Sequence, residues 1–163
     1  MSEKPTPLFL IVLAGIGTGL LSPLNVNGTP VLVLVVPFAI LTALLYNAET
    51  AIQVGIGASI LSGIFVHALG LWSIVAYALA ATTTILAYDA IYPKQKNELN
   101  ASLFAVLGVL LYEFFHELYT RENMLFRPEI FMGTNPVLGI QIVGSVLVAG
   151  ILFYQWVRPA GKK

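Results

Sequence analysis

The sequence predicts an all-α integral membrane protein, a compact bundle of about six transmembrane helices in one polytopic domain over residues 1–163. Three observations lead to this prediction. Of the 163 residues, 58% are hydrophobic and 10% are charged, whereas soluble domains carry about 25% charged residues. The mean hydropathy is +0.87, and long apolar segments follow one another with short polar breaks. Because a soluble protein needs a polar surface, this composition suits the lipid bilayer as solvent.

Six apolar segments are long enough to cross the bilayer, since a helix that spans about 30 Å of hydrocarbon needs about 20 residues. No segment shows the two-residue alternation of a membrane β-barrel, so helices are expected. Turn-forming residues such as Asn27-Gly28, Asn47 and Pro93 separate the segments. The helices are predicted at roughly residues 8–24, 30–46, 50–68, 71–92, 101–119 and 136–157.

The first two segments carry features that affect their interpretation. The first has the position of a signal peptide, but its start holds only Lys4 beside Glu3 and no small-residue cleavage site follows Leu21. It is therefore expected to be a retained helix. Pro37 lies inside the second segment, where a proline removes a helix hydrogen bond, and a kink is predicted there.

The distribution of basic residues predicts that both termini lie in the cytoplasm (N-in/C-in), because cytoplasmic loops are enriched in lysine and arginine. An even number of spans places the two termini on one side, and only Arg121 and Arg127 fall on the other. The expected location is the inner (cytoplasmic) membrane, as a multi-pass protein. The basic residues on the cytoplasmic side are Lys4, Lys94, Lys96, Arg158, Lys162 and Lys163.

The charge balance and the cysteine count exclude several classes of protein. Eight basic residues balance eight acidic residues, whereas a nucleic-acid binder needs an excess of basic residues to neutralise phosphates. The sequence has no cysteine, which excludes disulfides, thiolate metal sites and cysteine nucleophiles. The run Gly15-Ile16-Gly17-Thr18-Gly19 lies within a span and lacks the preceding strand of a phosphate loop.

Small residues spaced four apart predict close helix contacts, because they let two backbones approach each other within lipid. Gly15 and Gly19 have this spacing in the first helix, and Gly55, Ser59 and Gly63 have it in the third. Such contacts are expected either within one compact bundle or with a partner protein.

Ionisable residues inside spans are the other candidates, because burying a charge in lipid is costly. Glu113, His116 and Glu117 share one face of the fifth helix, and His67 and Gln141 are expected at a similar outer depth. A Glu-x-x-His pattern can bind metal, but di-iron bundles use it twice and it occurs once here. We therefore predict no catalytic residue, no metal and no cofactor, with Glu113 pairing inside the bundle or meeting a partner's helix.

Four short motifs occur along the chain in an order that is typical of one family. They are a turn before the second helix, a glycine-rich third helix with a Leu-Gly turn and an Ala-Tyr pair after it, an acidic residue in the fifth helix, and a segment before the last helix. The residues are Asn27-Gly28-Thr29-Pro30, Val54-Gly55-Ile56-Gly57 with Leu69-Gly70 and Ala76-Tyr77, Glu113, and Phe126-Arg127-Pro128-Glu129-Ile130-Phe131. In these features the chain resembles the MreD family of bacterial rod shape-determining membrane proteins. Many members have an aspartate in the third helix, where this chain has Ser59 and Ser62.

The resemblance implies a non-enzymatic scaffold of the cell-elongation machinery. Such a protein binds the membrane-anchored scaffold MreC and links cytoplasmic MreB filaments to the peptidoglycan synthases. Contacts with a partner or between helices are expected at Gly15, Gly19, Gly55, Ser59, Gly63 and Glu113, and contacts of the outer loop at Phe126, Arg127 and Glu129.

A second class, the substrate-binding S component of an energy-coupling-factor transporter for vitamins or metals, also has about six helices with short loops. In that case Ala14, Gly15 and Gly19 would form the docking face of the first helix. A pocket open to the outside would use Trp72, Glu113, His116 and the loop at residues 120–135. An intramembrane enzyme is the third class.

Overall fold

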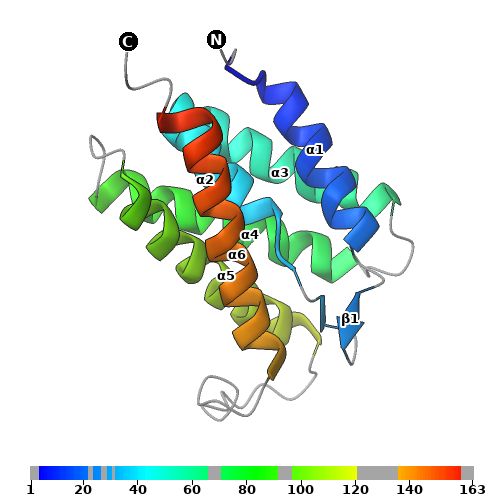
Figure 1. The fold of residues 1–163 in the computed structure, drawn as a ribbon. Coiled ribbons are helices and arrows are strands. Elements are labelled where there is room, and N and C mark those ends of the chain that lie inside the picture. Colours follow the sequence, from blue (N-terminus) through cyan, green and yellow to red (C-terminus); the bar gives the residue numbers. More distant parts are fainter. Residues whose placement is uncertain are drawn as a thin grey trace.

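The computed structural model describes residues 4–21, 24–26, 29–30, 32–65, 71–91, 97–120 and 136–158. The predicted helical class is confirmed for these residues, which form six α-helices and one pair of two-residue antiparallel strands (Figure 1). The elements are α1 (Pro7–Leu21), β1 (Asn25–Val26), β2 (Thr29–Pro30), α2 (Val35–Leu45), α3 (Ala48–Phe65), α4 (Leu71–Ile91), α5 (Glu98–Thr120), α6 (Pro136–Leu152) and the π-helical turn η2 (Phe153–Val157).

Three of the described helical segments are long and apolar enough to cross a membrane: Leu71–Ile91, Glu98–His116 and Val137–Val157. The segments Pro7–Leu21 and Val35–Leu45 are apolar but shorter, as is the described stretch Ala48–Ile64 of the third helix. The length and apolar composition of the three long helices indicate a membrane protein.

The predicted second helix was wrong at its start. The prediction placed it from residue 30, whereas α2 begins at Val35, and its first hydrogen bond joins the backbone N–H of Phe38 to the carbonyl of Leu34. Pro37 explains the difference, because its ring would clash with the carbonyl of Val33 in a longer helix. The proline therefore lies in the first turn, where its missing N–H costs no helix bond, and the predicted kink within this helix is also wrong.

Asparagine residues begin two of the other helices. The side-chain carbonyl of Asn47 accepts a hydrogen bond from the backbone N–H of Thr50 at 2.8 Å. The side-chain carbonyl of Asn97 accepts a hydrogen bond from the backbone N–H of Asn100 at 2.7 Å. Each side chain satisfies one of the free N–H groups at a helix start. For this reason α3 and α5 start at Ala48 and Glu98, earlier than the apolar segments from which they were predicted.

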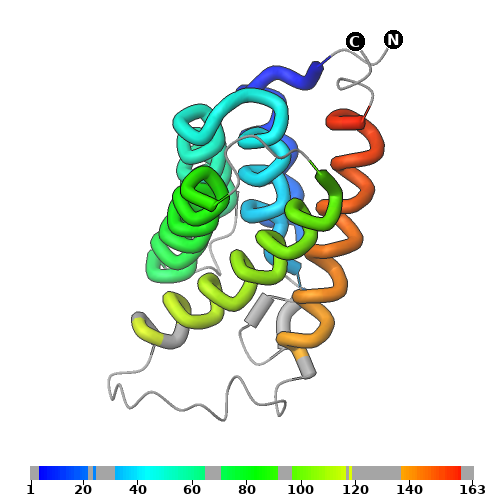
Figure 2. Tube along the Cα trace, turned by 90° about the vertical axis from the view of Figure 1, so that its left-hand side faces the viewer, coloured from blue at the N-terminus to red at the C-terminus, as the bar shows by residue number. Residues whose placement is uncertain are grey.

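Helix α2 is the centre of the bundle. Every one of its residues except Ala43 is buried, and it contacts each of the other five α-helices. Figure 2 shows α2 in light blue between α3 and α4 on one side and α6 on the other. A helix that is apolar on all sides is expected to be enclosed by other helices. The non-helical residues Val33 and Leu34 that lead into it are also buried, so protein surrounds them and not lipid.

Small residues bring the neighbouring helices close to this centre. A Cβ atom at Gly55 of α3 would lie 2.8 Å from the Cβ of Ala81 in α4 and 3.6 Å from the Cβ of Ala39 in α2. A Cβ atom at Gly108 of α5 would overlap Val36 of α2 and lie 3.1 Å from Oγ1 of Thr84 in α4. A side chain at position 108 would force Val36 to shift, because three helices meet there.

The start of α1 and the end of η2 lie at the same end of the bundle, which we call the terminal end (Figure 2). There the hydroxyl of Tyr46 donates a hydrogen bond to the carbonyl of Pro5 at 2.6 Å. The ammonium of Lys4 lies 3.7 Å from the centroid of the Tyr46 ring. These contacts join the start of α1 to the end of α2 at the terminal end.

Replacement of Gly108 by alanine should destabilise the protein by about 1–3 kcal/mol, because the added methyl group overpacks the contact with Val36. Thermal unfolding of the purified protein in detergent measures the effect. Gly139→Ala is the matched control, since a Cβ at Gly139 of α6 has nothing within 4 Å. Equal unfolding temperatures for the two variants would contradict the close contact at Gly108.

Candidate functional site

A cluster of polar side chains lies inside the bundle, near the end opposite to the terminal end. Its centre is Tyr77 of α4, which stacks on Tyr112 of α5 with ring centroids 4.4 Å apart and planes 17° apart. The ring of His116, one turn further along α5, lies 5.5 Å from the Tyr112 ring. Ser73 of α4 is a polar neighbour of the Tyr112 hydroxyl. We call Ser73, Tyr77, Tyr112, Glu113 and His116 the polar cluster.

Glu113 is the carboxylate of the polar cluster and is 3% exposed. It lies near enough to both tyrosines to interact with them electrostatically. Gln141 of α6 is fully buried and lies within two turns of the helix start, as Glu113 lies within two turns of the end of α5. Glu113, His116 and Gln141 each have an interaction partner in the structure, as is expected of costly polar groups in lipid.

Solvent access decides what the polar cluster can do. Tyr77 and Tyr112 are fully buried, and the two stacked rings fill the space between α4 and α5. Among the described residues, the stacked rings pack α4 against α5.

Three of the predicted small-residue positions, Gly15, Gly55 and Gly63, lie in contacts between helices of this chain. A Cβ at Gly15 of α1 would lie 2.8 Å from the Cβ of Leu61 in α3, and one at Gly63 of α3 would overlap Ile74 of α4. Gly19 is buried in α1. The hydroxyl of Ser59 donates a hydrogen bond to the carbonyl of Gly55 at 2.7 Å. The structure therefore uses these positions inside the bundle, on the α1–α3 and α3–α4 faces.

Several predicted residues lie outside the part of the chain that the structure describes. His67 and the outer-loop residues Phe126, Arg127 and Glu129 belong to this group. Glu117 lies in α5, but its side chain is also outside the description. Of the five residues predicted to share one outer depth, the structure places Glu113, His116 and Gln141.

The described residues contain no group of three or more histidine, aspartate or glutamate side chains arranged to hold a metal ion. Glu113 and His116 are one turn apart on α5, and the ring of His116 is turned toward Tyr112. Within this part of the chain, the neighbours that the Glu-x-x-His pattern shows are the aromatic side chains of Tyr77 and Tyr112.

The sequence analysis did not identify Tyr77 and Tyr112 as members of the cluster. Their position in the sequence could have indicated this, because both tyrosines lie inside predicted spans and not at the interfaces where tyrosine is common. A buried tyrosine needs a polar neighbour for its hydroxyl. The lone Gly108 in the middle of the fifth span was a second such signal.

Comparisons of the chain with protein-family models, with curated proteins and with solved structures find no match. The resemblance to the MreD family therefore rests on the short motifs in the sequence. The function is argued below from those motifs and from the geometry of the bundle.

Replacement of Glu113 tests whether its role is structural. Glu113→Leu should lower stability by about 1–3 kcal/mol, because it leaves buried polar partners unsatisfied, whereas Glu113→Gln should cost less than that. Thermal unfolding in detergent gives both values. Glu49→Leu, at an exposed position of α3, is the control and should change stability by about 0.5 kcal/mol or less. Equal losses for glutamine and leucine, together with loss of a bound transition metal, would instead indicate a metal centre.

Proposed function

We propose that the protein is a non-enzymatic membrane scaffold of the bacterial cell-elongation machinery, similar to MreD. The observation that carries the proposal is the burial of the polar groups among the described helices. Glu113 is 3% exposed, and Tyr77, Tyr112 and Gln141 are fully buried. These polar groups stabilise one arrangement of the helices, and the protein would act by presenting a fixed outer surface to its partners.

We further propose that all six helices lie in the inner membrane, with both termini in the cytoplasm. Two of the shorter helices support this, because they expose large apolar side chains: Leu8 (70%) and Leu20 (74%) on α1, and Ile64 (64%) on α3. Exposed apolar patches of this kind are rare on soluble proteins. The six-to-two distribution of lysine and arginine favours the cytoplasmic placement of the termini.

The surface available to a partner includes α1. This helix packs mainly on α3 and contacts α2 to a lesser extent, so its outer face, with Leu8, Val12 and Leu20, points away from the bundle. An MreC-like anchored protein would contact this face with its membrane helix and the loop at Phe126, Arg127 and Glu129 with its outer part. MreB filaments and peptidoglycan synthases would join through the complex.

The transporter alternative is less well supported. It requires Ala14, Gly15 and Gly19 of α1 as an open docking face. In the structure all three are buried, and Gly15 packs against Leu61 of α3.

The proposed topology can be tested with engineered cysteines, since the sequence contains none of its own. Gln95→Cys should react with a membrane-impermeant maleimide only after the cytoplasmic side is opened, because this position lies among the basic residues of the inner side. Asn123→Cys should react in intact cells. Labelling of Asn123→Cys from the cytoplasm alone would overturn the proposed orientation.

Photo-crosslinking in living cells tests the scaffold role. A benzophenone amino acid at Leu20, which is 74% exposed on α1, should form an adduct with an MreC-like anchored protein. The same amino acid at Leu44, which is 2% exposed in the central helix, is the control and should form none. An adduct with a transporter ATPase or its membrane subunit would favour the alternative, and the absence of any protein adduct at Leu20 would remove support for the scaffold.

A further inference from the structure

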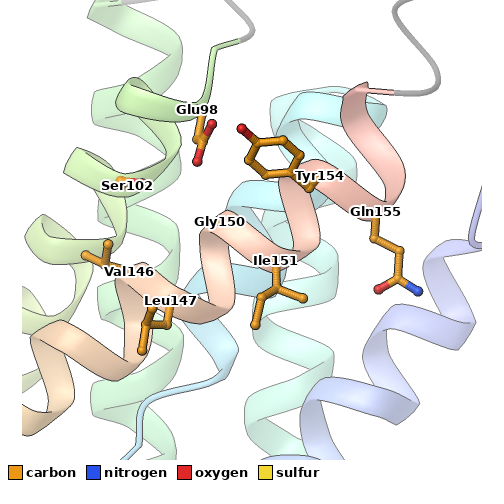
Figure 3. A pocket seen from close by; sticks show the side chains of 8 residues that line it. All are labelled: Glu98, Ser102, Val146, Leu147, Gly150, Ile151, Tyr154 and Gln155. Atoms are coloured by element: carbon orange, nitrogen blue, oxygen red, sulfur yellow. The ribbon is translucent and has the colours of Figure 1, made fainter.

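A groove of about 620 Å³ opens on the outer side of the bundle, between the first turns of α5 and the last turns of α6 with η2. Helix α5 runs obliquely to α6 in both views, and the groove lies beside their crossing (Figures 1 and 2). Figure 3 shows the carboxylate of Glu98 and the hydroxyl of Tyr154 together at one end, with Val146 and Leu147 at the other. Its lining residues are Glu98, Ser102, Val146, Leu147, Gly150, Ile151, Tyr154 and Gln155.

The length of the groove matches one leaflet of a bilayer. From Val146 to Tyr154 a helix rises about 12 Å, and the hydrocarbon of one leaflet is about 15 Å deep, half of about 30 Å. The polar end lies toward the terminal end of the bundle, where headgroups are expected. A partner's transmembrane helix would need a contact surface through both leaflets, whereas a single acyl chain needs only this length.

The polar end carries both signs of charge. The carboxylate of Glu98 is on α5, and the guanidinium of Arg158 lies 5.0 Å from the centroid of the Tyr154 ring. Tyr154 is 51% exposed, and Arg158 is also exposed. A carboxylate accepts hydrogen bonds from an ammonium group, while a guanidinium and a phenol donate to a phosphate. Those are the two charged parts of a phospholipid whose headgroup ends in a primary amine.

The backbone of η2 sets the position of these groups. The N–H of Arg158 bonds to the carbonyl of Phe153 across the wide π turn. A π turn is rare and occurs frequently at functional sites. Tyr154 lies in this turn with its hydroxyl beside the carboxylate of Glu98, and the guanidinium of Arg158 lies over its ring.

Gly150 forms the narrow part of the floor. A Cβ atom there would lie 3.8 Å from Oε1 of Glu98, so the glycine leaves the groove open up to the carboxylate. A large side chain at this position would occupy the groove without entering the core of the bundle.

We propose that this groove binds one phospholipid of the phosphatidylethanolamine class, from the leaflet at the terminal end. An acyl chain lies along Val146, Leu147 and Ile151, the ammonium group bonds to Glu98, and the phosphate contacts Arg158 and Tyr154. The site is independent of the scaffold function and does not rest on it.

Native mass spectrometry of the full chain in detergent tests the proposal, with dioleoyl phosphatidylethanolamine and dioleoyl phosphatidylcholine as the two probes. The wild type should bind one ethanolamine lipid about tenfold more tightly than the choline lipid, whose quaternary ammonium has no N–H to donate to Glu98. Glu98→Gln should remove this preference. Glu49→Gln, an exposed carboxylate in the first turn of α3, should keep it.

Two further variants separate the parts of the site. Gly150→Leu should lower the affinity for both lipids about tenfold or more, while Gly139→Leu, at an open position of the same helix, should not. Arg158→Gln, at an exposed position, should weaken the binding of both lipids equally. Equal affinity of the wild type for the two lipids, or unchanged binding in both Glu98→Gln and Arg158→Gln, would overturn the proposal. Loss of a dimer in Gly150→Leu without loss of lipid would show instead that a second copy occupies the groove.

Discussion

The structure depends on the requirement that every backbone polar group within a bilayer find a partner inside the protein. The central helix α2 has 11 residues, which corresponds to about 16 Å. The non-helical residues before it would be unstable in lipid. They are tolerated because the other helices enclose them and bury Val33 and Leu34. Glycine at Gly55 and Gly108 is what lets α3 and α5 approach closely enough to do this.

The same enclosure shapes the polar cluster. In hydrocarbon a carboxylate such as Glu113 requires partners, and here it is buried near Tyr77 and Tyr112. Their stacked rings pack α4 against α5. The features that keep Glu113 in the interior of the described bundle are therefore contacts between the protein's own helices.

Composition and turn residues were sufficient to predict the helical class, because apolar length and polar breaks are local properties of the chain. The start of α2 was mispredicted, since hydropathy does not register the clash between Pro37 and a carbonyl four residues earlier. Gly55 and Gly63 were identified by spacing, whereas Gly108 was missed because its neighbours Val36 and Thr84 come from two other helices. Glu113 was identified because burying a charged side chain in lipid costs free energy. The Tyr77–Tyr112 stack was not, since periodicity does not specify which helices meet.

The two ends of α5 show how one helix can serve different environments. Near its end, Tyr112 and Glu113 face the interior, and their polar atoms are enclosed by neighbouring helices. At its start, Glu98 lies beside an open groove, at the depth where the proposed phospholipid would place its headgroup. A carboxylate at that depth is hydrated or paired at little cost, so it needs no protein partner to be stable. Its contribution there is to selectivity: it favours a ligand that brings an ammonium group and disfavours one that brings a second negative charge.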